Sequence, residues 1–273
     1  MLLHHELVTA PGATPSKAVI FLHGILGSGA NLRSHAKKLV QVKPHYAAVL
    51  MDLRAHGASL GVEGADTVES CARDVAQTAR TLALPVAAIV GHSFGGKVAL
   101  AFAKEHPEVE NVVTLDSAPG PRPDARGSET TAQVIALLES LRGPWPTRDA
   151  FTKDVEAHGL GRGIAQWLAM NLERRDDGFH FRLELSRIRA LLDDYLQVDL
   201  WPLVERSAHE RAGPAFHLVI GTRSKVYEHA DLVHAHVLES GSGGHVTVDL
   251  LDAGHWVHVD DPGGVSAVLE KRL

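Results

Sequence analysis

Short apolar runs alternate with stretches of helical spacing along the first part of the chain. The apolar runs predict buried strands at 17–22, 46–52, 86–90 and 111–116. Helices are predicted between them, the first from 31 to about 40. Strands that are apolar throughout and alternate with helices indicate a parallel sheet that is covered on both faces. The pattern therefore predicts an α/β fold with a mostly parallel central sheet flanked by helices.

One of these helices has polar residues that mark its start. Asp66 is predicted as the N-cap, with Glu69 three residues later as in a capping box. Val68 and Val75 then fall on one face of the helix. Cys71 lies in the same helix, where we expect it to be a small buried apolar residue.

The alternation stops after residue 117. Between 118 and 212 the chain becomes rich in Pro, Arg and Trp, with leucines at helical spacing. We therefore predict that 1–117 and 213–273 form one core and that 118–212 is a helical cap, or lid, inserted into it. Beyond the cap, strands are predicted at 215–221 and 245–251, and helices near 228–239 and from 262.

The composition narrows the class of protein. The chain has 273 residues, 45% of them hydrophobic, which suffices for one domain with an insertion. A formal net charge of −6 argues against nucleic acid as a partner. No apolar run approaches the length that spans a bilayer, so no membrane span is predicted. The sequence leaves the oligomeric state unknown.

The N-terminal residues and the cysteine count bear on the compartment. The chain starts Met-Leu-Leu-His-His-Glu, without the basic and then apolar segments of a secretory signal. The single cysteine excludes an internal disulfide and fits a reducing compartment. We expect a cytoplasmic protein, and an organelle stays open if a transit peptide is absent from this sequence.

The strongest chemical signal is the run Gly-His-Ser-Phe-Gly at 91–95, between a β-branched run and an Ala-rich helical stretch. This is the pattern of a nucleophile elbow, a sharp strand-to-helix turn. Gly91 and Gly95 would let neighbouring elements approach because they lack a Cβ. The helix start would direct its N–H groups toward a developing oxyanion. Ser93 is therefore the predicted nucleophile, and an ordinary glycine-rich turn is the alternative.

A serine hydroxyl needs a base to take its proton, and an oxyanion needs two preorganised N–H donors. His255 is the predicted base because it sits in a Gly-His turn after the last strand, and this fold class orders its triad Ser, acid, His. His258, on the same segment, is the weaker candidate. The predicted donors are the backbone N–H groups of Phe94 and of Ile25, in the loop after the first predicted strand.

The acid is harder to assign. Most enzymes of this fold carry an Asp after the strand that is here 215–221, and this chain has Ser224 there. Asp116 ends the preceding strand, should lie at the same edge of the sheet, and is the predicted acid. A serine can orient an imidazole but cannot neutralise an imidazolium, so Ser224 is predicted to bridge or orient. Glu228 and Asp231 are the alternatives for the acid, and a turn-forming Asp is the alternative role for Asp116.

Several side chains near these elements are candidates for contact with a substrate. Some belong to the glycine-containing loop after the strand at 17–22 or to the elbow. A histidine there could contact a substrate or could only stabilise its own loop. The tryptophans of the cap region could line an acyl pocket or simply be core. No metal site is predicted. The candidates are His23, Leu26, His92, Trp145, Trp167 and Trp256.

Several segments together resemble the α/β-hydrolase superfamily and, more narrowly, its YbfF-type esterase group, which includes the eukaryotic abhydrolase-domain protein eleven. The Gly-Gly-Lys after the elbow serine and the Asp-Leu-Arg-x-His-Gly loop are the more discriminating parts. Cap residues 171–172 and 178–182 are also similar to that group. The segments that carry most of the resemblance are 21–28, 51–59, 90–97 and 252–256.

The resemblance implies a serine hydrolase that acts on carboxylic esters through a Ser-His-Asp triad, without a cofactor. That group carries an Asp after the sixth strand and a serine after the seventh, which correspond to Asp116 and Ser224. The chain departs from the group at 60–61 and 144–146, around the expected substrate entrance. We expect a small-molecule ester with a short to medium acyl chain. A thioesterase or lipid-ester hydrolase is the alternative enzyme, and a non-catalytic receptor or scaffold is the alternative of another class.

Overall fold

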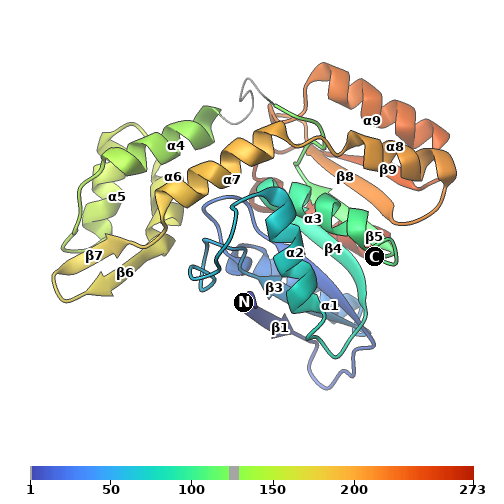
Figure 1. Cartoon of the computed structure of the whole chain (residues 1–273), viewed down its shortest axis with the longest axis horizontal. Helices are drawn as coiled ribbons and strands as arrows, with labels where there is room; N and C mark the ends of the chain where they lie inside the picture. The colour runs from blue at the N-terminus through green and yellow to red at the C-terminus, as the bar shows by residue number, and fades with distance from the viewer. Residues whose placement is uncertain (1, 123–128) are drawn as a thin grey trace.

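A computed structural model describes residues 2–122 and 129–273 (Figure 1). In this part of the chain, seven strands form one sheet in the order β1-β3-β2-β4-β5-β8-β9. Every neighbouring pair is parallel except β1 with β3 at one edge, which confirms the predicted sheet. The strands are β1 (His5–Val8), β2 (Lys17–Leu22), β3 (Tyr46–Met51), β4 (Val86–His92), β5 (Asn111–Leu115), β8 (Ala215–Gly221) and β9 (Val246–Leu251).

Both faces of the central part of the sheet are buried, which explains why strands such as β2 and β3 are apolar almost throughout. In β2, Ala18, Ile20 and Leu22 belong to one core. Val19 and Phe21 belong to the core on the opposite face. Successive side chains of a strand point to opposite faces, so a strand covered on both sides needs an apolar residue at every position. The four-residue edge strand β1 has no such run, and the sequence analysis did not predict it.

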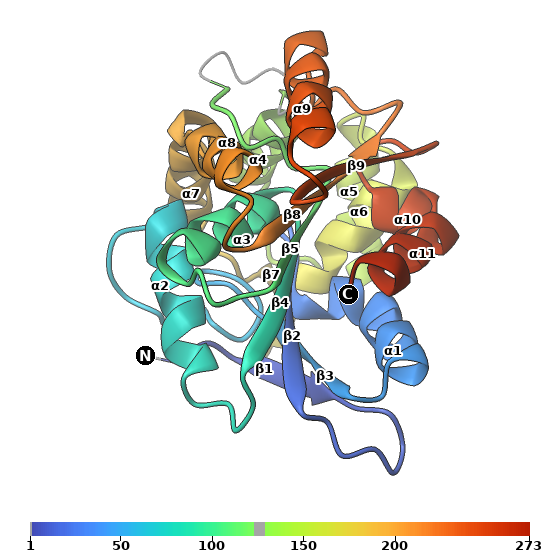
Figure 2. The ribbon, with the colours of Figure 1, turned by 90° about the vertical axis from the view of Figure 1, so that its right-hand side faces the viewer.

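Helices form a layer on each face of this sheet (Figure 2). Helices α1, α10 and α11 cover one face, and α2, α3, α8 and α9 cover the other. Among the described helices, none combines the length and the apolar character needed to cross a bilayer. Their bounds are α1 (Arg33–Val42), α2 (Val68–Ala79), α3 (Phe94–Glu105), α8 (Trp201–Glu210), α9 (His229–Gly241), α10 (Val257–Asp260) and α11 (Pro262–Arg272).

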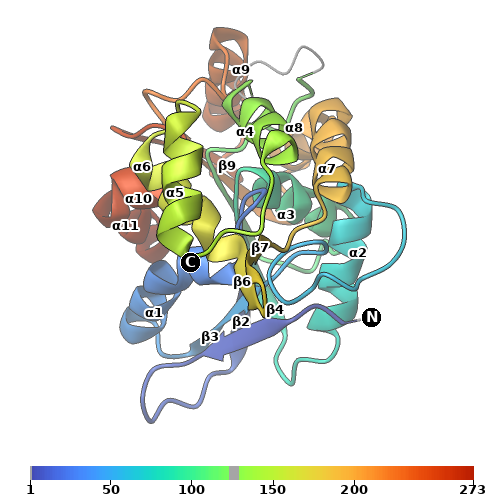
Figure 3. The same cartoon turned by 90° about the vertical axis from the view of Figure 1, so that its left-hand side faces the viewer.

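The chain between β5 and β8 contains a hairpin as well as helices (Figures 1 and 3). The sequence analysis predicted the helices of this insertion but not the hairpin. Strands β6 and β7 pair antiparallel. Each has only four residues, and the alternation of Phe179 and Phe181 about His180 is too short to predict a strand by itself. The elements before α8 are α4 (Glu129–Ser140), α5 (Arg148–Ala157), α6 (Arg162–Leu168), the 3-10 helix η2 (Ala169–Asn171), β6 (Leu172–Arg175), β7 (Gly178–Phe181) and α7 (Leu185–Gln197).

Helix α8 differs from the rest of this insertion. It lies inside the predicted cap, 118–212, but packs against β8, β9 and α9. The division into a core of 1–117 and 213–273 and a cap stays a prediction, and residues 123–128 of that cap lie outside the described residues. We call the elements from α4 to α7 the cap segment.

Helix α2 starts one residue later than predicted. Thr67 is its N-cap, and its side-chain oxygen accepts a hydrogen bond from the Ser70 N–H at 3.1 Å. The prediction that Asp66 and Glu69 form a capping box was wrong. Asp66 instead faces Arg187 of α7, a partner 121 residues away that no local pattern reveals.

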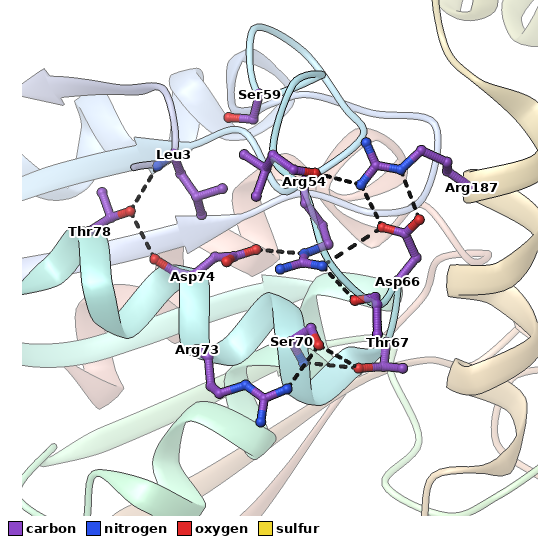
Figure 4. Close-up of polar contacts among 12 residues, drawn as sticks. Leu3, Arg54, Ser59, Asp66, Thr67, Ser70, Arg73, Asp74, Thr78 and Arg187 are labelled. Carbon is purple, nitrogen blue, oxygen red and sulfur yellow. Dashed lines mark hydrogen bonds and ion pairs between the residues drawn. The ribbon is translucent and has the colours of Figure 1, made fainter. Parts of the chain in front are cut away.

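Four charged side chains join α2 and the region before it to α7 of the cap segment (Figure 4). Arg187 donates to both carboxylate oxygens of Asp66, at 2.8 and 2.6 Å. It also donates to the carbonyl oxygens of Leu60 and Val62. Arg54 is buried and donates to Asp74 at 2.6 Å. Arg54 also lies 3.9 Å from Asp66. Two arginines thus balance two aspartates, so these charges are removed from water as pairs.

Lys97 of α3 holds the other end of α7. Its side chain is fully buried, and Nζ donates to the carbonyl oxygens of Tyr195, Val198 and Gly120 at 2.7, 2.9 and 2.8 Å. Three carbonyl groups match the three N–H donors of an ammonium group. Burial lowers the pKa of Lys97 to about 7. The helix that follows the elbow is therefore tied directly to the cap segment.

We expect Arg187→Met to lower the free energy of unfolding by about 2 kcal/mol, because a largely buried ion pair that loses one partner leaves the other uncompensated. Urea denaturation measures this loss. Arg175→Met is the matched control, since Arg175 pairs with Glu173 on the exposed hairpin and an exposed pair contributes less than about 1 kcal/mol. Equal losses in the two variants would contradict a special role for the network at α7.

Burial also gives the fold a defined response to acid. His217 of β8 lies 2.8 Å from Thr247 Oγ1 and 3.1 Å from Asn111 Oδ1. Burial lowers the pKa of His217 from 6.5 to about 4. Between these values the unfolded chain binds more protons than the folded one, so stability decreases as the pH falls.

We therefore expect the free energy of unfolding to fall as the pH is lowered from 6.5 to 4, with His217 contributing up to about 1.4 kcal/mol per pH unit. Urea titrations at several pH values would measure the slope. His217→Gln keeps a polar group that does not titrate in this range. The slope of its free energy of unfolding against pH should be smaller, by an amount equivalent to the uptake of up to one proton. An identical slope in both proteins would show that His217 is not protonated on unfolding.

Candidate active site

Ser93 occupies the turn between β4 and α3 in a strained conformation, with φ 51° and ψ −118°. A positive φ is costly for a non-glycine residue, and such strain gathers at functional sites. Two glycines make the turn feasible. A Cβ on Gly91 would lie 2.1 Å from the carbonyl oxygen of Gly95, and a Cβ on Gly95 would lie 2.5 Å from that of His23. The close approach of these backbones is what requires glycine at both positions.

Three of the predicted site residues form a hydrogen-bonded series with His255 in the middle. Ser93 Oγ is 3.0 Å from His255 Nε2, and His255 Nδ1 is 2.7 Å from Asp116 Oδ2. The three residues follow β4, β9 and β5 respectively. Because the carboxyl ends of parallel strands meet at the same edge, residues far apart in the chain converge there. With the Nδ1 proton donated to Asp116, Nε2 is free to accept the proton of Ser93.

Asp116 is fully buried, and donors from three segments surround its carboxylate. Its Oδ1 accepts the Gly221 N–H at 3.1 Å. Its Oδ2 accepts the Ser224 hydroxyl at 2.5 Å as well as the His255 ring N–H. Burying a carboxylate is costly unless it is hydrogen-bonded. Ser224 therefore lies where it satisfies the buried acid. Its hydroxyl donates to Asp116 and accepts the Val226 N–H, and within the described residues it forms no hydrogen bond with the ring of His255.

The two alternative acids lie at the start of α9. Glu228 is the N-cap of that helix, and its N–H donates to Asp231 Oδ2 at 2.8 Å. Both ring nitrogens of His255 already have partners, Ser93 and Asp116. Neither alternative therefore has a ring nitrogen left to bind.

The loop after β2 lies directly against the elbow and carries one of the predicted oxyanion donors. A Cβ on Gly24 would lie 3.4 Å from Ser93 Cβ. Leu26 has a φ of 62°, and its N–H donates to His56 Nε2 at 2.9 Å. In the described part of the chain, the N–H groups of Ile25 and Phe94 donate to no protein acceptor. Both predicted donors are thus free to bind a substrate oxygen.

Four further histidines surround this site. Burial lowers the pKa of each ring, to about 3 for His56, to about 4 for His258, and below 6.5 for His23 and His92. These rings are therefore neutral at neutral pH. His92 Nε2 lies 2.9 Å from the carbonyl oxygen of His255, so it helps to hold the backbone of the predicted base in place.

A cavity of about 540 Å³ opens above Ser93 and His255. Its opposite wall comes from the cap segment, with Val134 of α4 and Ile164 and Trp167 of α6. The volume lies in the range of small-molecule sites, which combine apolar walls with a few convergent polar groups. The cavity can therefore hold an apolar group beside the serine hydroxyl.

Five of the six candidate substrate contacts line this cavity: His23, Leu26, His92, Trp167 and Trp256. The rings of Trp167 and Trp256 lie 5.3 Å apart, so one tryptophan from the cap segment meets one from the segment after β9. This pair joins the two sides of the cavity.

The structure does not bring Trp145 to the cavity. Its ring is 8% exposed, packs edge-on against Phe151 at 4.9 Å, and donates through Nε1 to Asp154 at 2.9 Å. It belongs to the core of the cap segment. The sequence analysis did not single out Val134 or Ile164, because apolar residues at helical spacing look the same in a core and in a pocket wall.

Comparison with known proteins identifies the family to which the chain is similar. A family model described as the alpha/beta hydrolase family matches residues 19–268. The chain is 29% identical to the sn-1-specific diacylglycerol lipase ABHD11 of Mus musculus over 95% of this chain and 81% of that protein. It is 26% identical to esterase YbfF of Escherichia coli over 100% and 99%. A marine microorganism esterase of known structure superposes with a TM-score of 0.80 at 23% identity, covering 100% and 99% of the two chains.

We expect Gly95→Ala to lower the melting temperature and to impair the site, because the added Cβ would collide with the backbone after β2. Gly241→Ala at the end of α9 is the control, since a Cβ there meets nothing within 4 Å and the substitution should leave stability unchanged or slightly higher. Thermal unfolding of both variants tests this. A Gly95→Ala variant as stable as wild type would show that the elbow tolerates a side chain.

Proposed function

The chain belongs to the alpha/beta hydrolase family, and we propose that it is a serine esterase. In this proposal Ser93 attacks a carboxylic ester, His255 moves the proton, and Asp116 supports the histidine. Backbone N–H groups of Ile25 and Phe94 bind the oxyanion. The names of the mouse and E. coli relatives, a lipase and an esterase, support ester hydrolysis as the reaction.

The observation that carries the proposal is the hydrogen-bonded series from Ser93 through His255 to the buried Asp116 at the base of the cavity. A nucleophile, a base and an orienting acid in this geometry are recognised by their roles, whatever the fold. A purely ligand-binding protein would need neither the strained serine nor the buried carboxylate.

The first half-reaction forms an acyl-enzyme. Ser93 Oγ attacks the ester carbonyl carbon while its proton passes to His255 Nε2. The carbonyl oxygen becomes an oxyanion, held by the N–H groups of Ile25 and Phe94. His255 then gives the proton to the leaving alcohol oxygen as the ester C–O bond breaks.

The second half-reaction regenerates the enzyme. A water molecule attacks the acyl carbon and passes a proton to His255. The same two N–H groups hold the second oxyanion. The bond to Ser93 Oγ breaks, the oxygen recovers the proton from His255, and the carboxylic acid is released.

Ser224 and Gly221 support the acid in this mechanism. Each donates to Asp116, so the carboxylate stays in place when the imidazolium forms beside it. A buried negative charge next to the ring stabilises that imidazolium more than an exposed one would. In this proposal Ser224 acts on the acid and does not replace it.

We propose that the cap segment forms the acyl side of the cavity, over the nucleophile. Val134, Ile164 and Trp167 would contact an acyl chain of short to medium length. The name of the mouse relative favours lipid esters as the alternative substrate class. An ester series graded by acyl length separates these two classes.

The test is hydrolysis of p-nitrophenyl esters from acetate to palmitate by wild type, Ser93→Ala, Asp116→Asn and Asp252→Asn. We expect kcat to fall about 10⁶-fold in Ser93→Ala and about 10⁴-fold in Asp116→Asn. Asp252 follows the same strand as His255, but it is exposed and pairs with Arg223, so Asp252→Asn should match wild type. The wild-type optimum should fall at a short or medium acyl chain.

Turnover retained by Ser93→Ala would contradict the proposed nucleophile. Full activity of Asp116→Asn would contradict the proposed acid. An optimum at palmitate would instead favour a lipid-ester hydrolase with the same mechanism.

A further inference from the structure

One residue of the cap segment reaches the loop that carries the Ile25 donor. Asn171, at the end of η2, is 4% exposed. Its Nδ2 donates to the carbonyl oxygen of Leu26 at 2.8 Å, across 145 residues of sequence. No other side chain of the described cap segment donates a hydrogen bond to this loop.

The backbone around Asn171 is itself held in place. Its carbonyl oxygen accepts the Arg182 N–H at 3.0 Å, which joins η2 to the residue after β7. Arg148 of α5 donates to the carbonyl oxygens of Ala169 and Leu172 on either side. The side chain of Asn171 therefore projects from a braced turn and not from a free loop.

The loop that Asn171 contacts needs such support. Leu26 has a φ of 62°, a conformation that costs a non-glycine residue of the order of 1–3 kcal/mol and persists only where the surroundings impose it. His56 holds the N–H side of Leu26, and Asn171 holds its carbonyl side. The Ile25 N–H lies two peptide units earlier in the same tight loop, so a shift of the Leu26 carbonyl would turn that donor.

We propose that Asn171 is a positioning residue for the oxyanion hole, through which the cap segment sets the direction of the Ile25 N–H. This inference rests on the proposed esterase function. The Asn171 amide does not touch the substrate. Its removal would leave the donor present but misdirected, so the oxyanion is stabilised less while the acyl pocket stays intact.

The test uses Asn171→Leu, which keeps a side chain of similar size without a donor. We expect kcat on the best p-nitrophenyl ester to fall about tenfold to a hundredfold, the loss typical of a misplaced or missing oxyanion donor. KM should change less than about threefold. Affinity for an alkyl boronic acid, which forms a tetrahedral adduct with the serine, should fall in parallel with kcat/KM.

Asn171→Asp adds a pH signature. A protonated carboxyl group can donate to the Leu26 carbonyl, whereas a carboxylate cannot. The ratio of its kcat to that of wild type should therefore fall as the pH rises through the pKa of the introduced carboxyl. This variant also decides the matter if Asn171→Leu does not fold.

The control is Asn111→Ala, which removes a partly buried asparagine amide that contacts His217 far from the cavity. It should lower stability and leave kcat and boronic acid affinity unchanged. Unchanged kcat and boronic acid affinity in Asn171→Leu, while Ser93→Ala is inactive, would overturn the inference alone. Turnover by Ser93→Ala would instead overturn the proposed function on which it rests.

Discussion

The carboxylate of Asp116 is buried completely, and much of the site is arranged to satisfy it. A buried charge without partners is unfavourable by far more than the net stability of a domain. Its donors come from the end of β8, from the loop beyond it and from the segment after β9. When this edge of the sheet folds, the same contacts therefore place His255 beside Ser93. A change that exposes Asp116 to water would also weaken the hydrogen bond that orients His255.

The cap segment is joined to the core by several polar contacts. Arg187 ties one end of α7 to the region before α2, and Lys97 ties the other end to the helix after the elbow. Asn171 adds a contact to the loop after β2. Each buried polar group is costly if its partner is lost, so the cap segment has one favoured position. The same contacts therefore fix both the cavity wall formed by the cap segment and the loop after β2 that carries the Ile25 N–H.

The parallel sheet and the candidates Ser93, His255 and Asp116 could be predicted from the sequence, because a strand buried on both faces must be apolar and parallel strands end at one edge. The cap hairpin could not, since its strands have four residues each, too few for their alternation to predict them. Asp66 and Thr67 are both good N-caps, and only the distant Arg187 decides between them. The contact of Asn171 had no signal either, because a single amide in a sequence does not reveal its partner.

The most direct measurement is labelling with an alkyl fluorophosphonate, followed by mass spectrometry of the intact chain and its peptides. Ser93 Oγ would displace fluoride and form a bond to phosphorus, since the arrangement with His255 makes this hydroxyl nucleophilic. The proposed mechanism predicts one label per folded chain, on the peptide that contains Ser93, and none after unfolding. A label on another residue, or no label on a protein that hydrolyses esters, would contradict Ser93 as the nucleophile.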